Sequence, residues 1–347
     1  MKTRTFINIG VSIIVGFVVM FAAIPVSAGD KIKFSLASEY PDKHPTIKNG
    51  ILPWIDDVKE KTGGKLKIQF FNPNALVPAK DAYAGLMIGA VDMILTPSQQ
   101  SARGKFPLSS VALLPFMFKN ANSGAQTVWE LYNKYPEMKK EYDGMKVLFQ
   151  WTSAPFEVHT NKKPVQSLED LKGLKMIVWT GELVGIVEAL GANPVEMTPH
   201  DTYLALQRGM ADGVICPIAP MKAFKISDVT KHHTIVGIMS THFYAGVNAD
   251  KWNKLPADVQ KVLLDTTGRN MVDVAARTLD DGDKKDTEWM KNKGHKFYTL
   301  SDTEKERWKA RIQPIVDKWI GKMEGLGYAN AGQFVKDAYT LGVKHSK

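Results

Sequence analysis

The sequence has a single cysteine among 347 residues, and this scarcity excludes several classes of protein. One cysteine permits no internal disulfide and no metal or cluster site that needs several thiolates. The composition is otherwise balanced, with 44% hydrophobic and 23% charged residues, which argues against a disordered, collagen-like or coiled-coil chain. The length predicts one large domain or two medium ones, with a sizeable core.

A concentrated basic arm is also missing. The formal charge is +9, but Lys2 and Arg4 belong to the N-terminal segment described below, and residues of both signs are interspersed along the rest of the chain. Nucleic-acid binding usually needs a clustered basic patch, so we expect no nucleic-acid partner. The charge remains compatible with a mild attraction of anionic solutes or of a membrane surface.

Familiar catalytic and cofactor motifs are absent as well. The chain has no Gly-x-Ser-x-Gly, no Walker-type phosphate loop, no Gly-x-Gly-x-x-Gly and no His-Glu-x-x-His. The adjacent pair His232–His233 cannot chelate a metal from one face of a helix or strand. We therefore expect no cofactor, no metal ion and no enzymatic activity, and an exported enzyme remains as an alternative.

The one long hydrophobic run stands at the N-terminus. Lys2 and Arg4 precede an uncharged stretch that ends at Ala28, and residues 26–28 are the small residues of a cleavage site. Residues 1–28 are therefore predicted to be a secretory signal peptide, whose removal leaves a periplasmic protein. An uncleaved membrane anchor is the alternative, because the run is long enough to span a bilayer.

Strands and helices alternate along the chain. The apolar patterns predict strands over 32–36, 66–71, 91–95, 174–179 and 213–216, and helices over 46–61, 79–88, 182–190 and 201–208. Pro53 either kinks the first helix or marks its true start. Such alternation is typical of parallel βαβ units and predicts an α/β fold.

A short pattern occurs once in each half of the chain. Residues 86–92 and 206–212 both read Leu-x-x-Gly-x-x-Asp, followed by apolar residues. Glycine ends a helix at little steric cost, and the aspartate then begins the next strand. The repeat indicates two similar α/β lobes, although a common helix–glycine–strand connection would also produce it by coincidence.

The two copies of this pattern suggest where a ligand binds. Open α/β sheets bind ligands beyond the carboxyl ends of their strands. Ser98 follows the strand of the first copy, and Cys216 ends the strand of the second. Both positions would therefore face a cleft between the lobes, with Cys216 a small buried residue rather than a nucleophile.

The last third of the chain reads as helical and highly charged. Residues 256–291 predict one long helix, which would exceed the width of one lobe and bridge both. Ser301 and Glu304 have the spacing of a capping box that opens a further helix, and Pro314 must kink or divide that helix. The apolar stripe around Trp308 at helical spacing is predicted to be core.

Several ordered blocks carry a family resemblance. The stretches 61–68, 89–93, 114–118, 163–175 and 191–213 resemble the solute-binding subunit of tripartite ATP-independent periplasmic (TRAP) transporters, of the dicarboxylate type. The clearest block is Tyr203-Leu-Ala-Leu-Gln-Arg-Gly-Met-Ala-Asp-Gly213, and the likeness extends from Ile32 to Tyr339.

The resemblance implies a periplasmic binding protein of the type II kind, with two α/β lobes, a hinge and a long bridging helix. Lobe I would comprise residues 29–154 and 243–282, and lobe II residues 155–242 and 283–347. The protein would capture a small organic solute between the lobes and deliver it to a TRAP membrane permease, and a monomer is expected. An ABC-type or sensory solute-binding protein is the second reading of the same fold.

This sequence departs from the family at four usual contact positions. Phe156 and Ile177 stand where relatives commonly carry arginines, Cys216 replaces an asparagine, and Pro199 replaces an aromatic residue. A planar guanidinium suits a carboxylate because it gives two parallel charge-assisted hydrogen bonds. Its loss at both positions makes the default dicarboxylate unexpected and predicts an atypical ligand.

Two kinds of compensation remain open. A different cation, from Lys80, Arg103 or His159, would keep the ligand an acid. Alternatively, aromatic faces and the carboxylates of Glu39 and Glu157 would hold an aromatic, neutral or amine solute. The predicted ligand-binding residues are Glu39, Ser98, Trp151, Phe156, Ile177, Trp179, Cys216 and His242, of which His242 matches a histidine that supports the cleft in the family.

Overall fold

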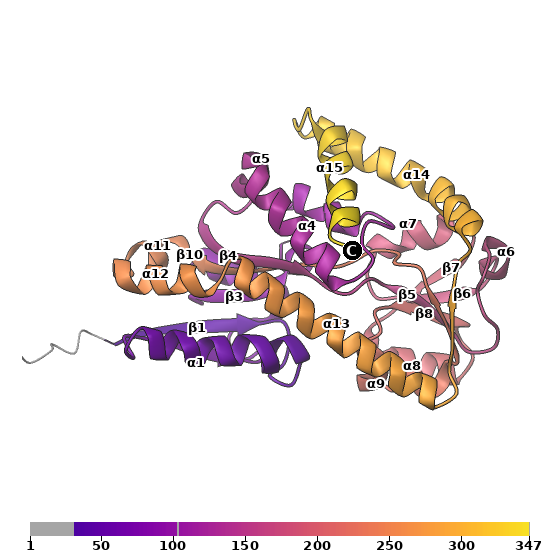
Figure 1. The fold of residues 1–347 in the computed structure, drawn as a ribbon, viewed down its shortest axis with the longest axis horizontal. Coiled ribbons are helices and arrows are strands. Elements are labelled where there is room, and N and C mark those ends of the chain that lie inside the picture. Colours follow the sequence, from indigo (N-terminus) through magenta and orange to yellow (C-terminus); the bar gives the residue numbers. More distant parts are fainter. Residues whose placement is uncertain (1–30, 103, 347) are drawn as a thin grey trace, which may run out of the picture.

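The computed structural model describes residues 31–102 and 104–346, which form two β-sheets with helices packed around them (Figure 1). The predicted signal peptide and Arg103 lie outside the described residues. Within the described ranges, no helix combines the length and apolar character needed to cross a bilayer.

The first sheet has five strands in the order β2-β1-β3-β10-β4. Its strands are β1 (Ile32–Ser38), β2 (Leu66–Phe71), β3 (Met93–Pro97), β4 (Met145–Thr152) and β10 (His242–Asn248). β1 runs parallel to β2 and β3, and β10 runs antiparallel to β3 and β4. The predicted βαβ units are therefore confirmed for β1, β2 and β3, while β10 comes from much later in the chain.

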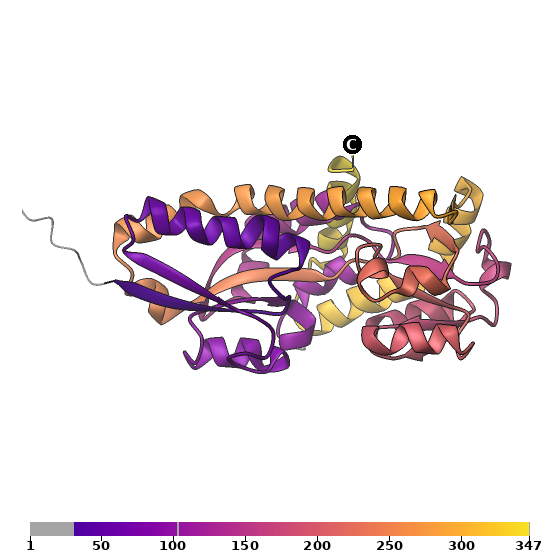
Figure 2. The ribbon, with the colours of Figure 1, turned by 90° about the horizontal axis from the view of Figure 1, so that it is seen from below.

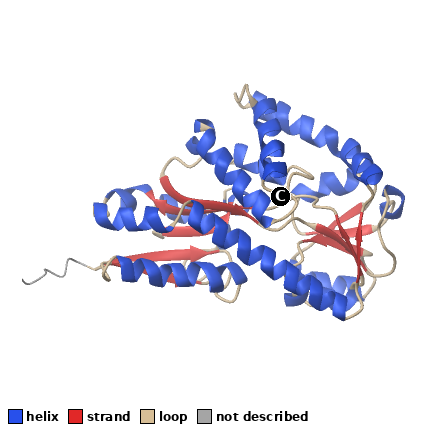
Figure 3. Cartoon of the chain, in the orientation of Figure 1, coloured by secondary structure: helices blue, strands red, loops and turns tan. Residues whose placement is uncertain are grey.

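The second sheet has six strands in the order β11-β9-β5-β8-β6-β7. Its strands are β5 (Glu157–Thr160), β6 (Lys175–Val178), β7 (Asn193–Glu196), β8 (Gly213–Cys216), β9 (His232–Ile235) and β11 (Lys296–Thr299). β6 runs parallel to β7 and β8, whereas β5 runs antiparallel to β8 and β9. Figure 3 shows the two sheets as separate bodies of strands.

The order β7-β6-β8-β5-β9 repeats the order β2-β1-β3-β10-β4. In each sheet the fourth strand arrives from the other sheet, because β5 follows β4 and β10 follows β9. The repeated sequence pattern has matching geometry: Gly89 and Gly209 both adopt a positive φ, of 74° and 69°. Asp92 accepts a hydrogen bond from the backbone N–H of Ser35, and Asp212 accepts one from Lys175. The two copies are thus structurally equivalent.

Helices cover both sheets. Those that follow strands of the first sheet are the π-helical η1 (Ile47–Ile51), α1 (Leu52–Lys61), the 3₁₀ segments η2 (Ala79–Asp81) and η3 (Leu108–Leu113), α2 (Ala82–Met87), α3 (Ser98–Ser101), α4 (Ala121–Lys134), α5 (Pro136–Lys140), α11 (Ala249–Asn253) and α12 (Ala257–Thr266). Those associated with the second are α6 (Leu168–Leu171), α7 (Glu182–Ala189), α8 (Pro199–Gln207), α9 (Pro220–Ala223) and α10 (Ile226–Val229). Pro53 lies in the first turn of α1, so it marks the start of the regular helix.

Two segments of extended chain cross between the sheets side by side. The segment 153–156 leads from β4 to β5, and 236–241 leads from β9 to β10. Their backbones are paired: Ser153 N–H donates to Thr241 O at 2.9 Å, and Phe156 N–H donates to Met239 O at 2.8 Å. The return bond from Ile238 N–H to Phe156 O measures 2.9 Å.

The predicted single helix over 256–291 is wrong. The structure has two helices, α12 and the 24-residue α13 (Arg269–Asn292), separated at Gly268. Gly268 has φ 57° and ψ −133°, a conformation that only glycine adopts readily, and its N–H donates to Leu148 O. The bridging role belongs to α13 alone, which runs along both halves of the molecule (Figure 2). Its first half packs in the first core through Met271 and Leu279, and Met290 packs in the second.

The helix α14 (Asp302–Gly325) is continuous through Pro314, so of the two predicted effects, a kink or a division, the division does not occur. Pro314 removes one helical N–H, and the carbonyl that this leaves belongs to exposed Ala310. Water can satisfy an exposed carbonyl, which explains why the helix continues. Trp308 and Ile312 of α14 pack in the second core, as predicted.

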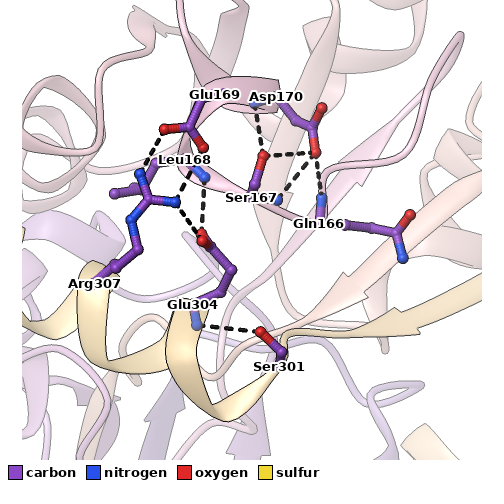
Figure 4. Close-up of polar contacts among 8 residues, drawn as sticks. All are labelled: Gln166, Ser167, Leu168, Glu169, Asp170, Ser301, Glu304 and Arg307. Carbon is purple, nitrogen blue, oxygen red and sulfur yellow. Dashed lines mark hydrogen bonds and ion pairs between the residues drawn. The ribbon is translucent and has the colours of Figure 1, made fainter.

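The start of α14 is tied to α6 by polar contacts (Figure 4). Ser301 caps α14 by accepting from Glu304 N–H at 3.2 Å, but the Glu304 carboxylate turns away and accepts from Leu168 N–H. Arg307 bonds both Glu304 and Glu169. Only half of the predicted capping box forms, because its glutamate serves a tertiary contact instead.

The last helix, α15 (Ala331–Lys344), packs against α4. Phe334 and Val335 of α15 lie in one apolar cluster with Val128 and Leu131 of α4. The end of the chain therefore contacts the half of the molecule that contains the first sheet.

Candidate functional site

The carboxyl ends of two strand pairs define the candidate site. β1 and β3 of the first sheet end at Ser38 and Pro97, followed by Glu39 and Ser98. β6 and β8 of the second sheet end at Val178 and Cys216. These are the equivalent edges of two sheets with the same order, so the predicted residues Glu39, Ser98 and Cys216 stand at corresponding places.

Glu39 is half-buried, and its backbone N–H donates to Leu95 O at 2.9 Å, which fixes it beside the end of β3. Burial raises the pKa of the Glu39 carboxyl from 4.5 to about 7. Near neutral pH the side chain is therefore protonated in a large part of the molecules. A protonated carboxyl donates a hydrogen bond, which a carboxylate cannot do.

Ser98 and Thr96 supply hydroxyl groups at the end of β3. Both side chains are fully buried, and neither hydroxyl has a hydrogen-bond partner within the described residues. Buried polar atoms normally find a partner, so these two hydroxyls are candidate contacts for a group that enters the site.

His242 lies at the start of β10, next to β3. Its Nε2 donates to Gln150 Oε1 at 3.2 Å, whereas its Nδ1 and the Gln150 amide nitrogen have no partner within the described residues. Burial lowers the pKa of His242 to about 3, so the imidazole is neutral. His242 thus holds Gln150 in place, and its role in supporting the cleft stays a prediction.

Three predicted residues are packed in the cores. Trp151 is fully buried and stacks on Phe243 with ring centroids 5.1 Å apart. Phe156, on a crossing segment, belongs to the core under α7 and α14. Ile177 has no exposed surface and belongs to a different cluster, with Cys216. Phe156 and Ile177 therefore fill apolar space, at positions where the family resemblance implies arginine.

Trp179 and Cys216 share one apolar cluster at the edge of the second sheet. The Trp179 indole is half-buried and donates to Thr202 Oγ1 at 2.9 Å, with Phe224 packed edge-on against it. The Cys216 thiol contacts Met221 Sδ at 3.6 Å, and burial raises its pKa well above the ordinary value. A protonated, buried thiol is unreactive, which agrees with the reading of Cys216 as a small apolar residue.

Glu157, His159 and Lys80 were considered in the sequence analysis as sources of charge for the ligand. Glu157 is buried and accepts from the backbone N–H groups of Val236 and Gly237, and burial raises its pKa to about 8. It is therefore largely neutral at pH 7. His159 is buried with its pKa lowered to about 4, and it supplies no positive charge there. Lys80 is exposed on η2.

Sequence patterns gave no indication of several polar groups near these strand ends. Gln150 stands on β4 and Thr180 lies two residues after β6, and each has a buried side-chain atom without a partner within the described residues. Asp283 of α13 has one such carboxylate oxygen, and burial raises its pKa to about 7. Their only distinguishing mark is burial, which depends on tertiary packing. Across the described ranges no group of three or more histidine, cysteine or acidic side chains is arranged to hold a metal ion.

The fold is that of a two-lobed binding protein. It has two sheets with matching strand order, two paired crossing segments and one bridging helix. Residues 36–322 match the family model of the bacterial extracellular solute-binding proteins, family 7 (DctP). The chain belongs to this family.

Similar proteins agree with this assignment. The C4-dicarboxylate-binding periplasmic protein DctP of Rhodobacter capsulatus is 30% identical over 276 residues, which cover 76% of this chain and 80% of that protein. A TRAP periplasmic solute-binding protein from Desulfovibrio salexigens has a similar crystal structure, with a TM-score of 0.85, 31% identity and coverage of 91% and 98%.

A marine metagenome TRAP solute-binding protein specific for aromatic acid ligands, solved with metahydroxyphenylacetate, gives a TM-score of 0.82 at 25% identity, covering 91% of this chain and all of that one. The predicted type II fold and the TRAP resemblance are thereby confirmed. TRAP solute-binding proteins bind small molecules and work with membrane permease subunits, and the family is periplasmic.

Proposed function

We propose that the protein is exported through the signal peptide at residues 1–28 and acts in the periplasm as a monomeric receptor without enzymatic activity. In this proposal one lobe comprises residues 29–154 and 243–282 and the other residues 155–242 and 283–347, with α15 of the second lobe packed on α4 of the first. They close on one solute and present it to a TRAP permease. The paired crossing segments support this motion, because a few short extended segments can absorb the dihedral changes of a hinge.

The solute is an aromatic acid held by neutral hydrogen-bond donors. The observation that carries this proposal is the burial of the apolar side chains of Phe156 and Ile177, at two positions where the family resemblance implies arginine. The strand ends offer instead the partly protonated Glu39 carboxyl and the unpartnered hydroxyls of Thr96 and Ser98. The aromatic-acid specificity of a similar solved protein supports the same class. The raised pKa values of Glu39 and Glu157 count against an amine, which would favour ionised carboxylates.

A thermal-shift screen tests the solute class. The purified protein is heated with aromatic acids, C4-dicarboxylates, sugar acids and aromatic amines, each in excess. A ligand at 100 times its Kd stabilises the folded state by about 2.7 kcal/mol, which is a readily measured rise in Tm. We expect hits among aromatic monocarboxylates and recovery of each solute unchanged. Hits confined to dicarboxylates would contradict the proposal, and turnover of a solute would establish an enzyme instead.

A further inference from the structure

Three buried histidines form a continuous hydrogen-bonded row across the second sheet. His159 of β5 and His233 of β9 are register partners, and their Nδ1 atoms are 2.9 Å apart. The other ring nitrogen of His233, Nε2, is 2.8 Å from Nδ1 of His295, which directly precedes β11. The exposed fractions of the three side chains are 0%, 0% and 5%. We call these three residues the histidine row.

At each end of the histidine row, the neighbouring group can act only as a hydrogen-bond donor or only as an acceptor. At the inner end, His159 Nε2 lies 3.0 Å from the backbone oxygen of Cys216, which can only accept. At the outer end, His295 Nε2 lies 3.2 Å from Nζ of Lys231, whose ammonium can only donate. Cys216 ends β8 at the candidate site, whereas Lys231 is exposed and directly precedes β9. The row therefore connects the candidate site with the protein surface.

These two ends determine the position of every ring proton. Because Lys231 donates to His295 Nε2, the proton of His295 is on Nδ1 and is donated to His233 Nε2. His233 then carries its proton on Nδ1 and donates it to His159 Nδ1. His159 carries its proton on Nε2 and donates it to the Cys216 oxygen. All four bonds are satisfied by this single arrangement of neutral imidazoles, and any other tautomer places two donors or two acceptors face to face.

The arrangement excludes two ordinary roles for clustered histidines. The ring nitrogens bond one another in sequence and do not converge on a point, so they offer no metal site. A carbonyl at the inner end takes up no proton, so the row is not a proton path into the site. The remaining role is structural. His159 holds the Cys216 carbonyl, and the two other rings hold His159 in the required tautomer.

We propose that the histidine row is a positioning unit for solute binding, which fixes the carboxyl end of β8 at the cleft. The proposal rests on the proposed function only in taking that strand end as part of the solute site. Like the hydrogen-bonded carboxylate that orients a catalytic or metal-binding imidazole, His233 and His295 act through another residue. Loss of one link releases the Cys216 carbonyl and loosens the strand end locally.

The surroundings keep the row neutral. Burial lowers the pKa of all three imidazoles, and the ammonium groups of Lys231 and Lys293 lower that of His295 further. Asp228 of α10 acts on His295 in the opposite direction, and His232, the neighbour on β9, bonds Tyr298 outside the row. Across the range near pH 7 the row should therefore hold one proton arrangement.

The first experiment is ring-nitrogen NMR on the intact protein labelled with ¹³C and ¹⁵N, with the ring signals assigned by through-bond correlations to the backbone. We expect a protonated Nε2 in His159 and a protonated Nδ1 in His233 and His295 at pH 7.5. The opposite tautomer in any one of the three breaks the row and overturns the proposal. This measurement needs no solute and no destabilising variant, so it stands even where a variant fails to fold.

The second experiment uses Cys216, the only cysteine of the chain, as a reporter of the strand end. The rate of its reaction with a disulfide reagent is measured at pH 7.5 for His295→Leu, His295→Asn and the matched control His232→Gln. Leucine breaks the row, whereas the asparagine amide, which occupies the place of Nδ1, still donates to His233. We expect His295→Leu to react about 10-fold faster than wild type, as one lost buried hydrogen bond would give, and the other two to stay within about 2-fold.

Packing alone predicts the reverse order, because leucine fills an apolar space better than asparagine. An unchanged rate in His295→Leu, or an equal acceleration in His295→Asn, overturns the positioning role. Urea unfolding of each variant separates local opening from global destabilisation, since only local opening raises the thiol rate more than the unfolding constant. A failed solute screen with the expected tautomers and rates would reject the proposed solute class and leave the histidine row in place.

Discussion

Glu39 is the residue on which the proposed solute class depends most directly. If its protonated carboxyl donates to a solute carboxylate, binding requires the protonated form, and affinity should fall as pH rises through about 7. Above that pKa each pH unit should weaken binding about 10-fold, because one unit corresponds to ~1.4 kcal/mol. Glu39→Gln keeps a donor that does not titrate, so its Kd should be nearly independent of pH between 6.5 and 8.5 (roughly the range where Glu39 titrates).

Isothermal titration of the best aromatic acid from the screen, at pH 6.5 and 8.5, measures this difference. Asp42→Asn is a matched control, since Asp42 is an exposed acid in the same connection after β1. Equal pH dependence in wild type and Glu39→Gln would remove Glu39 from the solute contacts.

Glu157 should make the folded protein less stable as pH rises. Its carboxyl is buried at the crossing segments, and its pKa rises from 4.5 to about 8 on folding. The folded state therefore retains a proton that the unfolded state releases above pH 4.5, and the stability of the fold falls as pH rises towards 8. Glu157→Gln keeps the acceptor for Gly237 N–H without this ionisation. We expect the variant to match wild type at pH 5 and to exceed it by a few kcal/mol at pH 9, at ~1.4 kcal/mol per pKa unit.

Urea unfolding at the two pH values gives both free energies. Glu306→Gln, on the exposed face of α14, is the control and should change neither by more than about 0.5 kcal/mol. A loss of stability in Glu157→Gln at pH 9 would mean that the carboxylate is ionised and bonded in the folded state.

At the scale of elements, Gly268 and Gly282 make a matched pair. Gly268 separates α12 from α13 with a positive φ, whereas Gly282 lies inside α13 with no atom within 4 Å of an added Cβ. Gly268→Ala should destabilise the fold by about 1–3 kcal/mol, because alanine is strained in this region. Gly282→Ala should stabilise it by about 0.5–1 kcal/mol through better helix propensity. Thermal unfolding of both variants measures the two shifts, and a neutral Gly268→Ala would show that the break needs no glycine.

The same break shows where sequence prediction reaches its limit. Apolar residues continue at helical spacing across Gly268, from Val259 and Leu263 to Met271, so periodicity alone predicted one helix. The deciding contact is Gly268 N–H to Leu148 O, which is a tertiary bond to β4. Short strands and helices with glycine ends were predicted well, since Gly89 and Gly209 act through local geometry.

In the candidate site, too, the features set by local sequence were predicted and those set by tertiary packing were not. Ser98 and Cys216 were placed at strand ends from the βα pattern, which is local in sequence. The histidine row was not foreseen, because His159, His233 and His295 meet only when β5, β9 and β11 pair. Likewise, the buried state of Phe156 and Ile177 depends on which helices cover each face of the second sheet.

For the whole molecule, the buried ionisable groups predict an unusual dependence of stability on pH. Burial raises the pKa of several carboxyls and lowers the pKa of several imidazoles. The carboxyls are Glu39, Glu141, Glu157 and Asp283, and the imidazoles are His44, His159, His233, His242 and His295. Between pH 8 and about 6.5 only the carboxyls matter: the folded state takes up protons on acidification and gains stability.

Below about pH 6.5 the imidazoles of the unfolded state take up protons that the folded state excludes, and this term opposes the carboxyl term. The two terms offset each other down to about pH 4.5, below which the unfolded carboxyls are protonated too and stability falls. We therefore expect the free energy of unfolding to rise as pH is lowered from 8.5 to about 6.5, to level off, and to drop below about 4.5. Urea unfolding across this range measures the curve. Stability that is constant or rises from pH 6.5 to 8.5 would mean that the buried carboxyls ionise without penalty, and that solvent or a bound cation reaches them in the folded protein.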